Sequence, residues 1–179
     1  MPGGGLAETP RATDVVPTIR RRMFSLAYEG VLLFGVVFIS GYLYSALTRF
    51  KGQAGSSLYF GFQATIFIAI GLYFVLSWRK GGQTLPMKTW KFRLASTSGA
   101  RPALAQCWAR YVLAWLGPLA GLAMYKVIVL LTAYGMTRFS LAAFFLALPV
   151  FAFNFIWALV DREQQFLHDR LARTRLIFA

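Results

Sequence analysis

Charged side chains are scarce in this sequence, and acidic side chains are the scarcest. Lys and Arg number 19, Asp and Glu number 6, and charged residues make up 14% of the 179-residue chain. Soluble domains carry roughly 25% charged residues, so an ordinary soluble domain is excluded. The hydrophobic fraction of 58% indicates a protein whose surface faces lipid.

Cysteine and histidine are almost absent, with one residue of each type, Cys107 and His168. A lone cysteine excludes an internal disulfide, and neither residue has the neighbours that zinc-site spacing requires. The chain also lacks an H-E-x-x-H pair, a phosphate-binding loop and a histidine within an apolar run that could activate a serine. We therefore expect no metal, no cofactor and no enzymatic activity.

Long apolar runs dominate what is present. Four of them predict membrane-spanning helices, at residues 23–47, 58–78, 111–134 and 139–160. Each run has at least 21 residues, which is enough to cross a hydrocarbon core of about 30 Å. The expected fold class is an all-α membrane protein with four transmembrane helices in two hairpins.

The segments outside these runs complete the expected organisation. Residues 1–17 are rich in Gly and Pro and are expected to form a disordered cytoplasmic tail. Residues 18–179 are expected to form one membrane domain, with a long basic loop at 79–110 and a C-terminal tail at 161–179.

Basic residues avoid the apolar runs and gather on one side of the expected membrane. Fifteen of the nineteen lie in the two tails and the long loop, three lie in the short turns, and Lys126 lies within the third run. The positive-inside rule then places both termini and the loop in the cytoplasm. This distribution also argues that the net charge of +13 serves membrane orientation and not nucleic-acid binding.

Apolar and basic residues alternate from Trp90 to Leu94 in the long loop. A period of two fits a short strand, and it also fits a segment at the headgroups with rings toward the membrane and cations toward anionic lipid. The residues expected to contact lipid or a cytoplasmic partner are Lys88, Trp90, Lys91 and Arg93. A plain cytoplasmic loop, basic for orientation alone, is the third interpretation.

Glu29 is the one carboxylate inside the first apolar run. A carboxylate facing lipid costs roughly 2–4 kcal/mol, so such a residue is normally turned inward, paired, protonated or functional. Arg22 precedes it by seven residues, which places the two side chains within about 20° of one helix face. We expect Glu29 to pair with Arg21, Arg22 or Arg110. The pair either fixes helix packing permanently, or leaves the acid able to titrate and to couple transport.

Three stretches together resemble the RDD family of bacterial membrane proteins. They are the segment from Arg21 to Glu29, the motif Gly82-Gln83-Thr84, and a closing Q-x-L-H-D-x-L-A-x-T pattern. The closing pattern contains Gln165, His168, Asp169 and Thr174. Two departures stand out: the family's intramembrane acid is usually aspartate, and its Gly-Lys after Gln-Thr is replaced by Leu85-Pro86-Met87 here.

The resemblance implies a multi-pass protein of the bacterial inner membrane, with transport suggested for some members. One functional class is therefore a small transporter or transporter subunit that uses Glu29, expected to be a homo-oligomer because four short helices enclose little room. The other class is a scaffold or interaction protein that binds anionic inner-leaflet lipid or a cytoplasmic partner through its basic loop. The sequence identifies no transported ion or solute.

Overall fold

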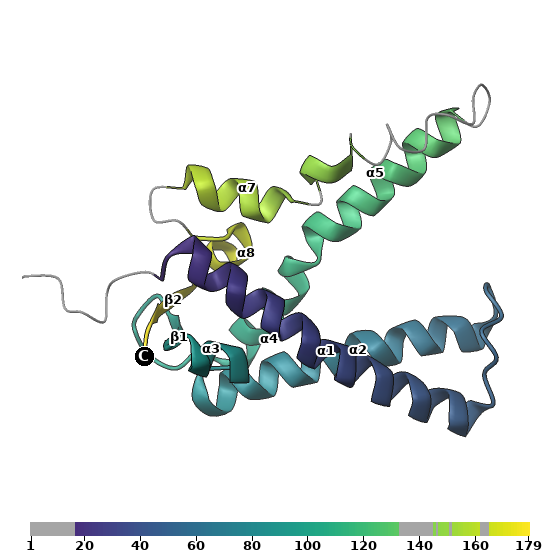
Figure 1. The fold of residues 1–179 in the computed structure, drawn as a ribbon, viewed down its shortest axis with the longest axis horizontal. Helices are drawn as coiled ribbons and strands as arrows, with labels where there is room; N and C mark the ends of the chain where they lie inside the picture. The colour runs from purple at the N-terminus through teal and green to yellow at the C-terminus, as the bar shows by residue number, and fades with distance from the viewer. Residues whose placement is uncertain (1–16, 133–144, 146, 151, 162–164) are drawn as a thin grey trace, which may run out of the picture. The chain divides into compact units, whose positions relative to one another are not determined.

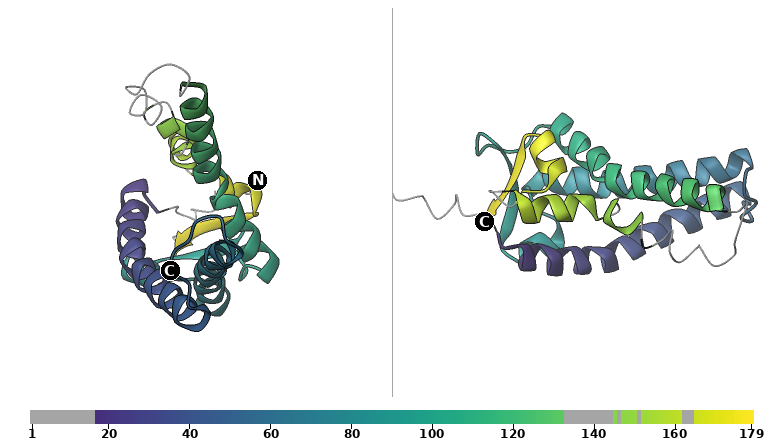
Figure 2. Two further views of the ribbon diagram at one scale, coloured as in Figure 1. Left: turned by 90° about the vertical axis from the view of Figure 1, so that its right-hand side faces the viewer. Right: turned by 90° about the horizontal axis from the view of Figure 1, so that it is seen from above.

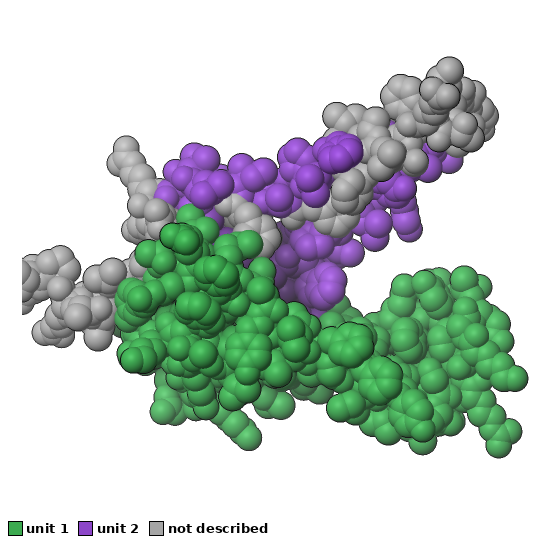
Figure 3. Space-filling view, viewed as in Figure 1, with its two compact units in different colours: residues 1–102, 176–179 green, residues 103–175 purple. Residues whose placement is uncertain are grey.

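A computed structural model describes residues 17–132, 145, 147–150, 152–161 and 165–179. The chain divides into two compact units, shown in different colours in Figure 3. Unit 1 comprises Met1–Pro102 with Leu176–Ala179, and unit 2 comprises Ala103–Arg175. The expected tail at 1–17 lies outside the described residues except for Pro17, which is buried.

Unit 1 is built on a helical hairpin of α1 (Ile19–Thr48) and α2 (Ser57–Gly81), which pack against each other (Figure 1). Both helices are long and apolar enough to cross a membrane, with mean hydropathies of 1.9 and 1.8. They contain the predicted runs 23–47 and 58–78 and extend beyond them at both ends. Figure 2 shows the same hairpin from two further directions.

The far end of the hairpin closes around aromatic side chains. The Tyr44 hydroxyl donates to the Leu58 carbonyl oxygen over 2.9 Å, and the rings of Phe50 and Phe62 pack against the Tyr44 ring. Gly41 lets the two helices approach closely here, since a Cβ at this position would lie 3.2 Å from the Phe62 ring. This packing fixes the register of the hairpin and thereby sets which α2 residues face Glu29.

Two short elements follow α2 in unit 1. Helix α3 (Leu85–Thr89) begins after the N-cap Thr84, and strand β1 (Phe92–Ser96) follows it. The alternation around Trp90 fitted either a short strand or a segment at the headgroups, and the structure contains a strand. It pairs with β2 (Thr174–Phe178), a C-terminal strand that the sequence did not predict.

Unit 2 contains α4 (Leu104–Ala114), α5 (Leu116–Thr132), α7 (Phe153–Val160) and α8 (Leu167–Leu171). Helices α4 and α5 follow each other across Trp115 and include the third candidate span, Leu104–Leu130. The helix begins seven residues before the predicted start at 111. Arg110 had marked that boundary, but its charge is paired inside the unit.

Three candidate membrane spans, long and apolar enough to cross a bilayer, are therefore present among the described residues. The predicted run 139–160 falls largely on residues outside the described part of the chain, and its described portion includes α7. A mostly helical membrane protein is confirmed, with a two-stranded sheet added.

Candidate functional site

Glu29 lies on a buried stripe of α1 with Arg22 and Ser25. The spacing of three and four residues places these side chains on one face of the helix, as predicted for Arg22 and Glu29. Only 4% of Glu29 is exposed, although neighbouring apolar residues of α1 are exposed on the surface. The carboxylate is therefore turned inward.

Two hydroxyl groups donate hydrogen bonds to the Glu29 carboxylate. The Tyr73 hydroxyl of α2 donates to Oε1 over 2.5 Å, and Thr84 Oγ1 donates to Oε2 over 2.6 Å. Each carboxylate oxygen thus has its own donor, from a different element. Hydrogen bonds to an ionised group are stronger than neutral ones, so both contacts favour this inward rotamer.

Thr84 holds its position because it is also the N-cap of α3. Its Oγ1 accepts a hydrogen bond from the Met87 backbone N–H over 3.4 Å while donating to Glu29. A hydroxyl can donate and accept at once, which a methyl group at this position could not do. The local chain reversal depends on Gly82, whose φ of 70° ends α2 in the left-handed region.

The prediction that Glu29 pairs with an arginine is wrong. Glu29 forms no ion pair with any residue that the structure describes. Arg22 Nε donates to the Pro17 carbonyl oxygen over 2.8 Å, and the Arg21 guanidinium lies over the Phe178 ring. Arg22 lies in the first turn of α1, close to the residues that precede the helix, so the Pro17 carbonyl oxygen is within reach of its side chain. Arg110 pairs with Asp169 within unit 2.

The loop residues that were expected to contact lipid or a cytoplasmic partner lie in different surroundings. Trp90 stacks on Phe24 of α1, with ring centroids 5.5 Å apart, so part of its ring packs on the protein. Lys88 and Lys91 are exposed, and Arg93 is half-buried in β1. Gln83 anchors the loop, since its Nε2 donates to the Phe92 carbonyl oxygen over 2.8 Å.

A second polar cluster, in unit 2, contains the closing motif. Asp169 is 1% exposed and forms an ion pair with Arg110, which ties α8 to α4. Thr174 and Gln165 are also buried, and the Thr174 hydroxyl donates to the Asp169 carbonyl oxygen over 3.4 Å. The motif residues therefore stabilise the turn between α8 and β2.

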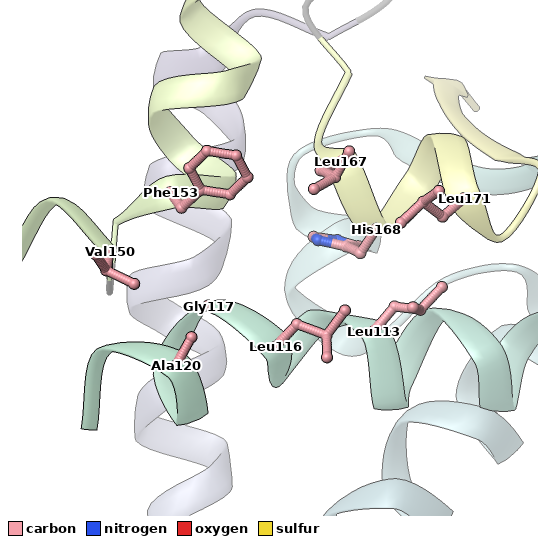
Figure 4. A pocket seen from close by; sticks show the side chains of 9 residues that line it. All are labelled: Leu113, Leu116, Gly117, Ala120, Val150, Phe153, Leu167, His168 and Leu171. Atoms are coloured by element: carbon pink, nitrogen blue, oxygen red, sulfur yellow. The ribbon is translucent and has the colours of Figure 1, made fainter. Parts of the chain in front are cut away.

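His168 is neutral in this cluster. Burial lowers the pKa of His168 well below its usual range, and the nearby Arg110 charge lowers it further. Within the described residues, its Nδ1 has no hydrogen-bond partner, and its ring stacks on Phe166. The imidazole lines a cavity whose volume is about 220 Å³. Figure 4 shows the imidazole among the other lining residues, which are apolar apart from one glycine. The other lining residues are Leu113, Leu116, Gly117, Ala120, Val150, Phe153, Leu167 and Leu171.

Two polar contacts, one at the Glu29 site and one structural contact outside it, escaped the sequence interpretation. Tyr73 was not singled out, because a tyrosine in an apolar run is also typical of a membrane interface. Asp161, which follows α7, accepts a hydrogen bond from Arg170 over 2.7 Å and one from the Gln165 backbone N–H. Its only sequence signal was its position directly after an apolar run.

No group of three or more His, Cys, Asp or Glu that could hold a metal occurs in the described ranges.

Comparison with known proteins agrees with the motif evidence. No curated protein and no solved structure matches the chain. The model of the RDD family matches residues 16–173, which include α1 with Glu29, the Gln83-Thr84 pair and the His168-Asp169 pair. The match covers most of the sequence, and the chain therefore belongs to the RDD family of membrane proteins.

Proposed function

We propose that this protein is a small transporter, or a subunit of one, of the bacterial inner membrane, and that Glu29 takes up and releases a proton during transport. The observation that carries the proposal is a buried carboxylate in a candidate membrane span with two hydroxyl donors and, among the described residues, no ion-pair partner.

Charge balance is the physical argument. Burying an ionised carboxylate without a countercharge costs several kcal/mol even after relaxation, so such a group tends to bind a proton or a cation. The hydrogen bonds from Tyr73 and Thr84 offset only part of this cost for the ionised form. Proton binding removes the charge entirely.

The two hydroxyls fit both protonation states of Glu29. They donate to the carboxylate when it is ionised. When the carboxyl group carries a proton, the Tyr73 hydroxyl can rotate so that its hydrogen points away. The Tyr73 oxygen then accepts a hydrogen bond from the protonated carboxyl group. Hydroxyl rotation alone is therefore sufficient for the two donors to accommodate the proton on Glu29.

Proton flux in proteoliposomes tests the proposal. The parent protein is expected to dissipate an imposed pH gradient, and Glu29→Gln is expected to abolish the flux while remaining folded by size-exclusion chromatography. Asp161→Asn, which removes an acid outside the site, is the matched control and should retain flux. Flux from Glu29→Gln equal to that of the parent would remove the coupling role.

The alternative function is a scaffold that contacts anionic lipid or a partner through the basic loop. The exposed side chains of Lys88 and Lys91 support it, because neither has an acidic partner among the described residues. A variant with Lys88, Lys91 and Arg93 all changed to Gln separates the two functions. If the basic loop carries the function, the triple variant should lose that function and Glu29→Gln should retain it.

A further inference from the structure

We propose that a groove on unit 1 is a binding site for one anionic phospholipid of the surrounding bilayer. The groove has a volume of about 740 Å³ and is lined by α1, α2, α3 and the turn between α2 and α3. The volume is in the range of small-ligand sites, roughly 300–1,000 Å³, and holds part of a phospholipid while the rest stays in the membrane.

One part of the groove is apolar and follows α1. Leu32, Gly35, Val36 and Ile39 line it at spacings of three and four residues, so they form one stripe. The stripe is about 10 Å long, from seven residues at about 1.5 Å each. Gly35 has no side chain and no heavy atom within 4 Å of where a Cβ would lie, so it leaves open space in this wall. These features fit an acyl chain lying along the helix.

The other part of the groove is basic. Lys80 in the last turn of α2 and Lys88 in the last turn of α3 both line it, and both are exposed. Neither lysine forms an ion pair with an acidic residue of the described ranges. Two uncompensated cations beside an apolar stripe match an anionic headgroup joined to a hydrocarbon chain.

A bilayer lipid suits this groove better than a water-soluble anion. The apolar wall belongs to α1, a candidate membrane span, and a small phosphate compound would contact only the lysines and make no use of this wall. Lipid is also present around the helix at high local concentration. The groove adjoins the Glu29 site through Tyr73, which lines the groove and donates to Glu29, whereas neither lysine contacts that carboxylate.

Native mass spectrometry of the full chain in detergent tests this site. The protein is titrated with phosphatidylglycerol and, separately, with zwitterionic phosphatidylcholine and with inorganic phosphate. The parent should retain phosphatidylglycerol in preference to phosphatidylcholine. Lys80→Gln and Lys88→Gln should each reduce this preference about fivefold, whereas Lys91→Gln, outside the groove, should not change it.

Two glycine variants test the apolar wall. Gly35→Leu fills the groove and should weaken binding of both lipids more than about tenfold. Gly30→Leu is the matched control, because its Cβ also meets no heavy atom within 4 Å and Gly30 does not line the groove. Helical content by circular dichroism identifies any variant that fails to fold.

The proposal is overturned if folded Gly35→Leu binds phosphatidylglycerol as the parent does. Equal loss of preference in Lys91→Gln would also overturn it, because the effect would then be general surface charge. Binding of inorganic phosphate with the same lysine dependence, and no lipid retention, would assign the lysines to a soluble anion instead.

Discussion

The hydroxyl groups of Tyr73 and Thr84 act on the same side chain, and each can be removed with little change in side-chain shape. Tyr73→Phe and Thr84→Val should each lower the free energy of unfolding by roughly 1–3 kcal/mol, because each leaves one Glu29 oxygen without its donor. Thr84→Ser keeps the hydroxyl and should stay close to the parent. Equilibrium unfolding in mixed micelles measures the difference. Destabilisation by Thr84→Ser without destabilisation by Thr84→Val would contradict this, because the role of Thr84 would then belong to its methyl group.

His168 makes the stability of the protein depend on pH in a defined direction. Its pKa in the folded state lies well below its usual value, so below the unfolded-state pKa of about 6.5 the unfolded chain binds a proton that the folded chain does not. Stability is therefore complete above that pH and should fall by about 1.4 kcal/mol per pH unit as the pH drops through it.

Because the chain has one histidine, one substitution removes this effect, and a Glu29→Gln background removes the other group proposed to exchange a proton. In that background, unfolding measured on both sides of the usual histidine pKa, from about pH 5.5 to about pH 7.5, should lose its pH slope when His168→Gln is added. An unchanged slope would mean that another group titrates in this range.

At this scale the sequence predicted the burial of Glu29 but not its partners. One acid in an apolar run is sufficient to predict an inward-facing side chain, because lipid exposure of a charge is costly. Tyr73 lies 44 residues from Glu29 along the chain, and its contact depends on the register of the α1–α2 hairpin. That register is set by side-chain packing, for which composition and spacing carry little information.

Among the elements, α2 ends at a position that only glycine fits well. Gly82 has φ of 70°, and a Cβ there would lie 3.0 Å from the Leu94 carbonyl oxygen. Gly82→Ala should destabilise the protein by more than about 1 kcal/mol, because the free-energy costs of the strained φ and of the close contact add up. Gly81→Ala is the control, since its Cβ would meet nothing within 4 Å, and it should be neutral or slightly stabilising. Thermal melting of both variants in detergent checks this, and similar melting temperatures would contradict it.

Long elements were predictable, whereas the short strand β1 was anticipated only as one of several alternatives and β2 was not predicted. The hydropathy of α1 and α2 identified both helices, since twenty or more apolar residues have few other solutions. Strand β2 has five residues and pairs with β1, which lies far away in the sequence. The third membrane span was predicted to begin at 111 because Arg110 was interpreted as a boundary charge, whereas the candidate span begins at Leu104 and Asp169 pairs with Arg110.

For the whole molecule, the distribution of Lys and Arg predicts which parts face the cytoplasm. The single cysteine, Cys107, is buried, so a background in which it is replaced by Ala suits cysteine labelling. Ser98→Cys, after β1, should be protected from a membrane-impermeant maleimide in intact cells, and Gln53→Cys, in the α1–α2 turn, should react. Both positions are exposed, so accessibility on the protein is matched. The reverse labelling pattern would invert the topology.

The central claim is that Glu29 exchanges a proton, and infrared difference spectroscopy of the protein in lipid tests it most directly. Spectra recorded on a change of pH should contain a protonated carboxyl band that is present in the parent and in Thr84→Ser and absent in Glu29→Gln. A difference spectrum of Glu29→Gln identical to that of the parent would contradict the account, because Glu29 would then keep one protonation state throughout.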